Sequence, residues 1–287
     1  EINMPHGSRV IEKGTSLSTP VVATSTLQVV FGTAPINLAQ STEYVNKPLL
    51  AYGFDEFVTA LGYSNDWENY TLCETADAAF RQFNIAPIVF VNVLDPAVHK
   101  ANGTATVPIE NKKAIVTSKG IMLDTLEVTT GVTSLVKDTD YIASFDDEGQ
   151  VVIALLTTQS ATELSVTFDR IAPEMVDKDD IIGGVDVNTG KNKGLELLNS
   201  VFPKFGLVPG LVLAPRFSKD PTVAAVMKAK ASSINSYFRA QSIDDVDTKA
   251  ANTYTKVSEW KNTNNYTGTN EVVCWPKVGL GDNVYHL

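Results

Sequence analysis

The sequence has few of the residues that metal, disulfide and nucleophile sites require. Its two cysteines, Cys73 and Cys274, are far apart and lack Cys-x-x-Cys or Cys/His spacing. We expect two buried, reduced thiols, with a disulfide as the alternative. The three histidines, His6, His99 and His286, have no neighbouring ligand at metal spacing. The sequence therefore predicts no metal site and no cofactor.

Basic residues are also scarce, with 23 Lys and Arg against 33 Asp and Glu and a formal net charge of −10. Contact with a phosphate backbone or an anionic membrane surface requires a basic surface. No stretch approaches the roughly 18 apolar residues of a membrane span, and the first residues lack the apolar core of a secretory signal. We expect neither nucleic acid nor a membrane as partner, and synthesis in the cytoplasm.

Motifs for catalysis or phosphate binding are weak. Residues 183–194 are glycine-rich, but five residues separate Gly184 from Gly190, and Asn192 stands where a phosphate loop needs Ser or Thr. A turn-rich segment leading into a helix is the favoured interpretation. No Gly-x-Ser-x-Gly motif is present, although a dispersed Ser/His/Asp triad stays open.

Acidic and aromatic residues offer two further candidates. Asp244, Asp245 and Asp247 could bind a divalent cation, but no glycine turn or later glutamate follows at calcium-loop spacing. We predict a solvated strand end instead. The tryptophans are expected to anchor the core or an interface rather than to stack on bases: Trp67, Trp260 and Trp275.

Strands and helices alternate in the first and last parts of the chain. Residues 26–35 and 85–96 are apolar runs typical of buried strands, and apolar residues recur at helical spacing between them, over 71–83. The alternation resumes with a helix near 193–206 and a strand within 207–215, and ends with a strand within 271–278. A long helix is predicted to begin at Asp220 as N-cap and Pro221, with one apolar face made of Val223, Met227, Ala231, Ile234 and Phe238.

The middle of the chain has a different pattern. From 108 to 180, short alternating strands are separated by turn residues, including a hairpin over 141–156. This segment has 14 acidic and 6 basic residues, whereas the remainder has 19 and 17. Like-charged surface resists packing against copies of itself, so we expect the segment to face outward from any assembly.

These patterns predict a discontinuous α/β core, a mixed sheet with helices on its faces, formed by 26–107 and 181–287. An all-β domain is inserted over 108–180. Residues 1–25 are predicted to be an N-terminal arm, because they are too short to form a core and contain β-prone stretches that could add a strand to a neighbour's sheet. The same segment is equally compatible with a tail that orders only on assembly.

Three blocks in order resemble the tail sheath proteins of contractile phages and prophages: PHGSRVIEKGTSLSTPVVATSTLQVVFGTAPIN, VFPKFGLVPGLVLAPRFSKDPTVAAVMKAKA and WKNTNNYTGTNEVVCWPKVGLGDNVYHL. The resemblance implies an α/β core with inserted decorating domains, and arms that link subunits. It also implies that a further C-terminal domain follows the equivalent of residue 287. The residues expected in inter-subunit arms are Arg9, Val10, Ile11, Val21, Val22, Tyr285 and Leu287.

A protein of this family is expected to be a structural subunit of the virion tail, not an enzyme. Its implied partners are copies of itself, the tail tube protein, and the baseplate and tail terminator proteins. The alternative is a cytoplasmic α/β hydrolase or small-molecule-binding protein with its pocket at the strand ends near Gly32 or Asp95. A pocket filled by the chain's own side chains would argue against that alternative.

Overall fold

A six-stranded sheet forms the centre of the α/β part. The computed structural model describes residues 27–187 and 189–286. Five neighbouring strands are parallel and one edge strand is antiparallel. The first two predicted strands lie beside each other at the centre, where their continuous apolar sequences are covered on both faces. In spatial order the strands are β15 (Glu271–Cys274), β14 (Gln241–Asp245), β13 (Leu211–Leu213), β1 (Gln28–Gly32), β3 (Ile88–Asn92) and β2 (Leu49–Ala51).

Helices connect these strands, and one hydrophobic core contains buried side chains from both the sheet and the helices. A π-helical turn, η2 (Asp77–Gln82), extends α2 along the helix predicted over 71–83. The α-helices are α1 (Phe54–Leu61), α2 (Thr71–Ala76), α3 (Lys178–Ile182), α4 (Leu198–Phe205), α5 (Pro221–Ser232) and α6 (Tyr254–Thr263). Short 3₁₀ turns are η1 (Ile36–Leu38), η3 (Leu123–Thr125), η4 (Pro173–Met175) and η5 (Gly194–Leu197).

The order of the strands creates a topological switch point between β1 and β13. From β1 the chain forms β2 and then β3 on one side, and from β13 it moves to β14 on the other. Right-handed crossovers in opposite directions place α2 and α5 on opposite faces of the sheet. Open α/β sheets bind ligands at the carboxyl ends of the strands at such a point. The contents of this crevice therefore bear directly on function.

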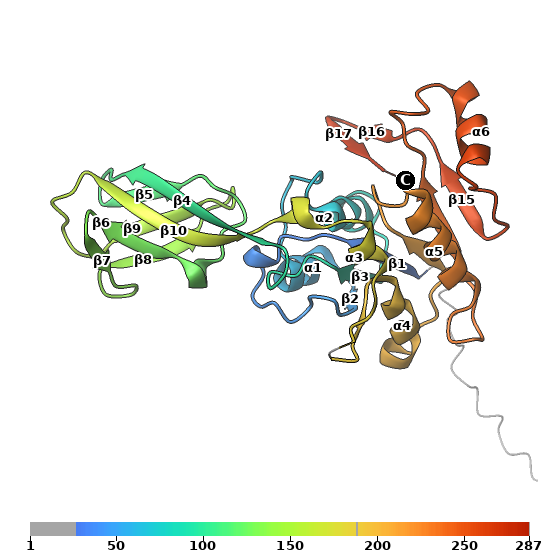
Figure 1. Ribbon diagram of the computed structural model, residues 1–287, viewed down its shortest axis with the longest axis horizontal. Helices are drawn as coiled ribbons and strands as arrows, with labels where there is room; N and C mark the ends of the chain where they lie inside the picture. The colour runs from blue at the N-terminus through green and yellow to red at the C-terminus, as the bar shows by residue number, and fades with distance from the viewer. Residues whose placement is uncertain (1–26, 188, 287) are drawn as a thin grey trace, which may run out of the picture.

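A second body, made of strands and one short 3₁₀ turn, η3, projects from the core (Figure 1). It has its own hydrophobic core between a four-stranded and a three-stranded antiparallel sheet. The first sheet contains β4 (Lys100–Pro108), β10 (Glu163–Ile171), β6 (Glu127–Thr130) and β7 (Thr133–Leu135). The second contains β5 (Lys113–Val116), β9 (Val151–Leu155) and β8 (Tyr141–Phe145), of which β8 and β9 are the predicted hairpin. We call residues 100–171 the β module.

The predicted boundaries of this segment, 108 and 180, need correction. β4 pairs with β10 from Lys100 to Pro108, so the module begins eight residues earlier. It ends at Ile171, because α3 begins after a capping box at Asp177 and packs in the α/β part. With these limits the module has ten acidic and six basic residues, a net charge of −4 rather than −8. Residues 172–180, which follow the module, carry −3 of the predicted −8, and the remaining difference comes from Lys100.

The predicted helix at Asp220 also ends earlier than its apolar pattern indicates. Asp220 Oδ1 accepts from the Thr222 N–H at 2.8 Å, which confirms the N-cap. α5 ends at Ser232, and the backbone turns sharply at Asn235. The predicted positions Ile234 and Phe238 therefore lie in the turn that precedes β14. The remaining small elements are two hairpins, β11 (Gly184–Val185) with β12 (Asn192–Lys193) and β16 (Val278–Leu280) with β17 (Asn283–Tyr285).

We propose that the β module folds independently of the core, and its removal tests this. Lys100 and Ile171 pair in antiparallel register, so an Asn-Gly turn can replace Ala101–Arg170 without moving either end. The variant is expected to keep a single cooperative thermal transition by circular dichroism. The module expressed alone should give an all-β spectrum and its own transition. Loss of cooperative unfolding in the deletion variant would contradict the proposal.

Candidate functional site

The crevice at the switch point is filled by the chain's own C-terminal segment. Tyr285 Oη donates to Asp77 Oδ2 at 2.8 Å, and the Tyr285 ring lies 5.0 Å from that of Trp67. The next residue, His286, donates its backbone N–H to Glu74 Oε1, and its Nδ1 lies 3.1 Å from the same oxygen. Side chains from α2 and the residues before 287 thus occupy the place where a ligand would be expected.

Charged groups from two further strand ends complete this cluster. Arg216, after β13, donates from Nε to Glu74 Oε2 at 3.2 Å. Its backbone N–H donates to Asp245 Oδ2 at 2.9 Å, and Ser218 Oγ accepts from the Asp245 N–H. We call Glu74, Asp77, Arg216, Asp245, Tyr285 and His286 the C-terminal clasp.

The clasp holds its carboxylates out of water. The side chain of Glu74 is only 3% exposed. Burial alone would raise the pKa of Glu74, but hydrogen bonds from His286, together with the charges of His286 and Arg216, hold that pKa below its ordinary value. Burial raises the pKa of Asp245, with the Arg216 N–H opposing it. The arrangement suits a structural ion-pair network rather than an open catalytic centre.

The strand end at Gly32 is closed as well. A Cβ on Gly32 would lie 2.2 Å from Thr71 Oγ1, so the backbone and α2 are in direct contact. Thr33 and Thr71 exchange hydrogen bonds, each backbone N–H donating to the other's hydroxyl at 3.2 and 3.1 Å. The small-molecule alternative places a pocket at the strand end near Gly32, but this position is filled by residues of α2.

Two cavities lie near Asp95, the second predicted position, with volumes of about 220 and 470 Å³. The larger is lined mainly by polar and charged residues, whereas small-molecule pockets are lined mostly by apolar side chains. The smaller is below the roughly 300 Å³ at which such pockets usually begin. His99 in its wall accepts from the Asp95 N–H at Nδ1 (3.0 Å), so its Nε2 carries the proton and faces Asp180 Oδ1 at 3.2 Å. The His99 carbonyl accepts from the Ala172 N–H at 2.9 Å. His99 therefore fastens both ends of the β module to α3, and neither ring nitrogen is free for catalysis.

Comparisons with known proteins give one informative match. No family model matches the chain. The chain is 27% identical, over 235 residues, to the tail sheath protein of Burkholderia phage BcepMu. The aligned region covers 80% of this chain. The chain is related to a phage tail sheath protein.

This relation confirms the family resemblance inferred from the three sequence blocks. The aligned region covers 46% of the phage protein, so the chain spans about half the length of this sheath relative. A virion structural role in the tail is the coarse function that the match supports. What the whole phage-type subunit does, and with which partners, is considered as a proposal below.

The predicted arm residues of a sheath subunit are mostly outside the described part of the chain. This applies to Arg9, Val10, Ile11, Val21, Val22 and Leu287. The exception is Tyr285, which is 7% exposed and part of its own subunit's core. Its assignment to an inter-subunit arm stays a prediction: in this conformation the ring packs on Trp67 and bonds to Asp77 of its own subunit.

The acidic trio also differs from its prediction. Asp247 is half-buried, as a strand end would be, but Asp244 and Asp245 are 0% and 5% exposed. They are buried because β14 is an inner strand of the sheet, flanked by β13 and β15 and packed against α5. No cluster of three or more potential metal ligands exists among residues 27–187 and 189–286.

The remaining sequence predictions have mixed outcomes. Cys73 is buried and Cys274 half-buried, and both thiols are free, so the disulfide alternative is wrong. Trp67 is a core residue, whereas Trp260 and Trp275 are only partly buried. In the described regions, no helix is long and apolar enough to cross a bilayer. The clasp itself was missed, because nothing in the spacing of its residues connects them.

Proposed function

We propose that the chain is the core part of a contractile tail sheath subunit. Copies polymerise around an inner tail tube in a metastable extended state, and contraction drives the tube through a cell envelope. The observation that carries this proposal is the match to a tail sheath protein over 80% of the chain. Partners in the proposal are other copies, the tail tube protein, and the baseplate and tail terminator proteins.

The structure supports a mechanical role in two ways. The crevice at the switch point is filled by Tyr285 and His286, so the site on which an α/β hydrolase or ligand-binding protein would depend is occupied. The β module stands away from the core on two strands, which adds outer surface without interrupting the sheet (Figure 1).

The free energy for contraction would come from packing alone. Two lattices of identical subunits can differ by a few kcal/mol per subunit, and a helical polymer multiplies this difference over many copies. No nucleotide is required in this scheme. Each subunit would keep its fold during contraction, and the contacts between subunits would change.

Electron microscopy of the full-length protein tests the proposal. Expressed alone or mixed with its tail tube protein, it is expected to form hollow, ribbed cylinders above a threshold concentration. Cylinders formed by the Ala101–Arg170 deletion variant, at whatever concentration they appear, should have a smaller outer diameter, because the β module is proposed to face outward. Monomers or compact oligomers at all concentrations, with and without tube protein, would overturn the proposed function.

A further inference from the structure

The turn between α5 and β14 has a fixed backbone. Ile234 and Phe238 form an antiparallel bridge, with N–O distances of 2.9 Å in both directions. Asn235 and Ser236 between them have φ values of 51° and 63°. Three residues separate the bridged pair, and two of them in succession have left-handed φ values, a conformation that is costly for serine and is kept only where the surroundings enforce it.

The surroundings here are supplied by α4. The Asn235 N–H donates to Asn199 Oδ1 at 3.0 Å, and the rings of Phe202 and Phe238 lie 4.8 Å apart. The turn is thereby held in one conformation relative to the core.

This rigid turn presents a tyrosine and an arginine to solvent. Tyr237 is 88% exposed, and Arg239 is exposed two residues later. Within the described parts of the chain, neither side chain takes part in a hydrogen bond, ion pair or ring contact. Tyrosine and arginine are enriched among residues that dominate binding energy, and a fixed backbone lowers the entropy lost on binding. We call Tyr237 and Arg239 the knob.

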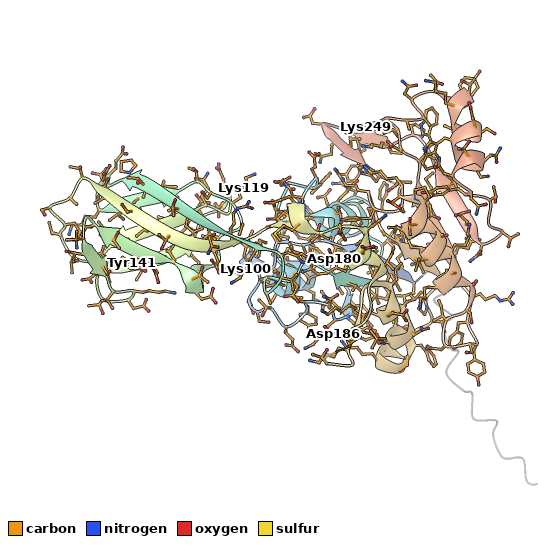
Figure 2. All side chains as sticks on the ribbon, in the orientation of Figure 1. Lys100, Lys119, Tyr141, Asp180, Asp186 and Lys249 are labelled. Atoms are coloured by element: carbon orange, nitrogen blue, oxygen red, sulfur yellow. The ribbon has the colours of Figure 1, made fainter. Side chains whose placement is uncertain are left out.

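A cleft of opposite charge lies at the junction of the β module and the core. Its volume is about 760 Å³. Four acidic side chains and one lysine give its wall a net charge of −3, and the aromatic rings of Tyr63 and Phe145 add an apolar surface. Figure 2 shows Lys119 at this junction. We call it the junction cleft, and the residues that matter here are Asp66, Asp146, Asp147, Glu148, Lys119 and Phe145.

The knob and the junction cleft lie at opposite ends of the parallel strands of the sheet. The knob immediately precedes β14, at the amino ends of the parallel strands. The loop that contains Asp66 covers the carboxyl end of β1, where Thr33 Oγ1 donates to the Asn69 carbonyl at 2.7 Å. A contact between two different surfaces need not be self-complementary, so it can repeat from one copy to the next. We take the contact to be head-to-tail, because such contacts continue into open helical polymers when the rotation between copies does not close a ring.

We propose that the knob of one copy of this chain docks in the junction cleft of the next copy in the polymer. The proposal rests on the proposed function and adds a specific contact to it. Arg239 is complementary to the acidic wall of the cleft, and the Tyr237 ring suits its aromatic surface. The contact would connect the core of one subunit to the β module of its neighbour.

Charge reversal with rescue tests this contact in the full-length protein. Arg239→Glu, and separately the pair Asp147→Lys with Glu148→Lys, should each raise the threshold concentration for cylinder formation at least about tenfold. Combining the three changes should restore assembly to near the wild-type threshold. Asp146 is left intact, because its carboxylate accepts from the Glu148 and Gln150 N–H groups and shapes the turn.

The chain offers matched controls for both surfaces. Tyr254 and Lys256 on α6 repeat the exposed tyrosine and base two residues apart, so Lys256→Glu controls for the knob. Glu110→Lys with Glu163→Lys controls for the cleft, since both residues are exposed elsewhere on the β module. Unchanged threshold concentrations in the knob and cleft variants would overturn the contact, and so would impaired assembly that the combined variant does not rescue. In either case, cylinders formed by the wild type would still uphold the proposed function. Absence of cylinders from wild type would overturn both.

Discussion

Replacing Glu74 by alanine is expected to lower the free energy of unfolding by about 3–5 kcal/mol. The carboxylate is buried between Arg216 and His286, and its removal leaves both without their acidic partner. It also removes the acceptor for the His286 backbone N–H, which holds the residues before 287 against α2. Urea unfolding at neutral pH measures the loss.

Two further variants separate charge from size. Glu74→Gln keeps an oxygen acceptor and the side-chain volume but loses the charge, so it should destabilise the protein by less than Glu74→Ala. Glu68→Ala, at an exposed position in the loop before α2, should change the free energy of unfolding by less than about 0.5 kcal/mol. A Glu74→Ala variant within 1 kcal/mol of wild type would show that the clasp does not stabilise the fold.

The central strands could be predicted because their apolar sequences match the burial that they acquire. β1 and β3 are continuous apolar runs and occupy the middle of the sheet. The first strand of the β module could not be predicted in this way. In β4, burial alternates along a strand whose inward positions are small, and a Cβ at Gly103 would lie 2.3 Å from the Phe168 ring. Phe168 on β10 supplies the apolar volume that β4 lacks, so the hydrophobic period of β4 is too weak to detect.

The clasp could not be predicted because tertiary structure alone brings its members together. Glu74 and His286 are 212 residues apart, and Arg216 and Asp245 come from two other strand ends. The charge pattern gave the wrong burial for Asp244 and Asp245, because adjacent carboxylates usually indicate a segment exposed to solvent. Their burial depends on β15 and α5, whose positions the local sequence of β14 does not encode. The family resemblance, by contrast, depended on long sequence blocks and did not require these contacts.

Asp244 is the buried carboxylate with the weakest compensation in the described structure. Its Oδ2 accepts from Ser242 Oγ at 2.8 Å, but its Oδ1 has no hydrogen-bond partner there. Two neighbouring carboxylates, Glu271 on β15 and Asp245, add negative charge near Asp244. Lys228 on α5 offsets this charge only partly, and its Nζ lies 3.4 Å from Glu271 Oε1. Burial, reinforced by Glu271 and Asp245, raises the pKa of Asp244 to about 7.

This raised pKa makes stability fall as pH increases. Between about pH 4 and pH 7 the folded protein retains a proton on Asp244 that the unfolded chain has lost. The free energy of unfolding therefore decreases through that window, by about 4 kcal/mol for a pKa difference of this size, and the contribution is constant above it. Below pH 4 the carboxyl is protonated in both states and makes no difference.

Asp244→Asn is therefore expected to stabilise the protein by about 2–4 kcal/mol at pH 8 and by almost nothing at pH 4. Asparagine keeps a carbonyl acceptor for Ser242 and carries no charge at any pH. Urea unfolding of variant and wild type at pH 4, 6 and 8 gives the difference directly. Asp247→Asn, at the half-buried end of the same segment, should follow the wild-type profile throughout. Parallel profiles for Asp244→Asn and wild type would mean that Asp244 is ionised in the folded protein and that α5 and β15 leave it access to water.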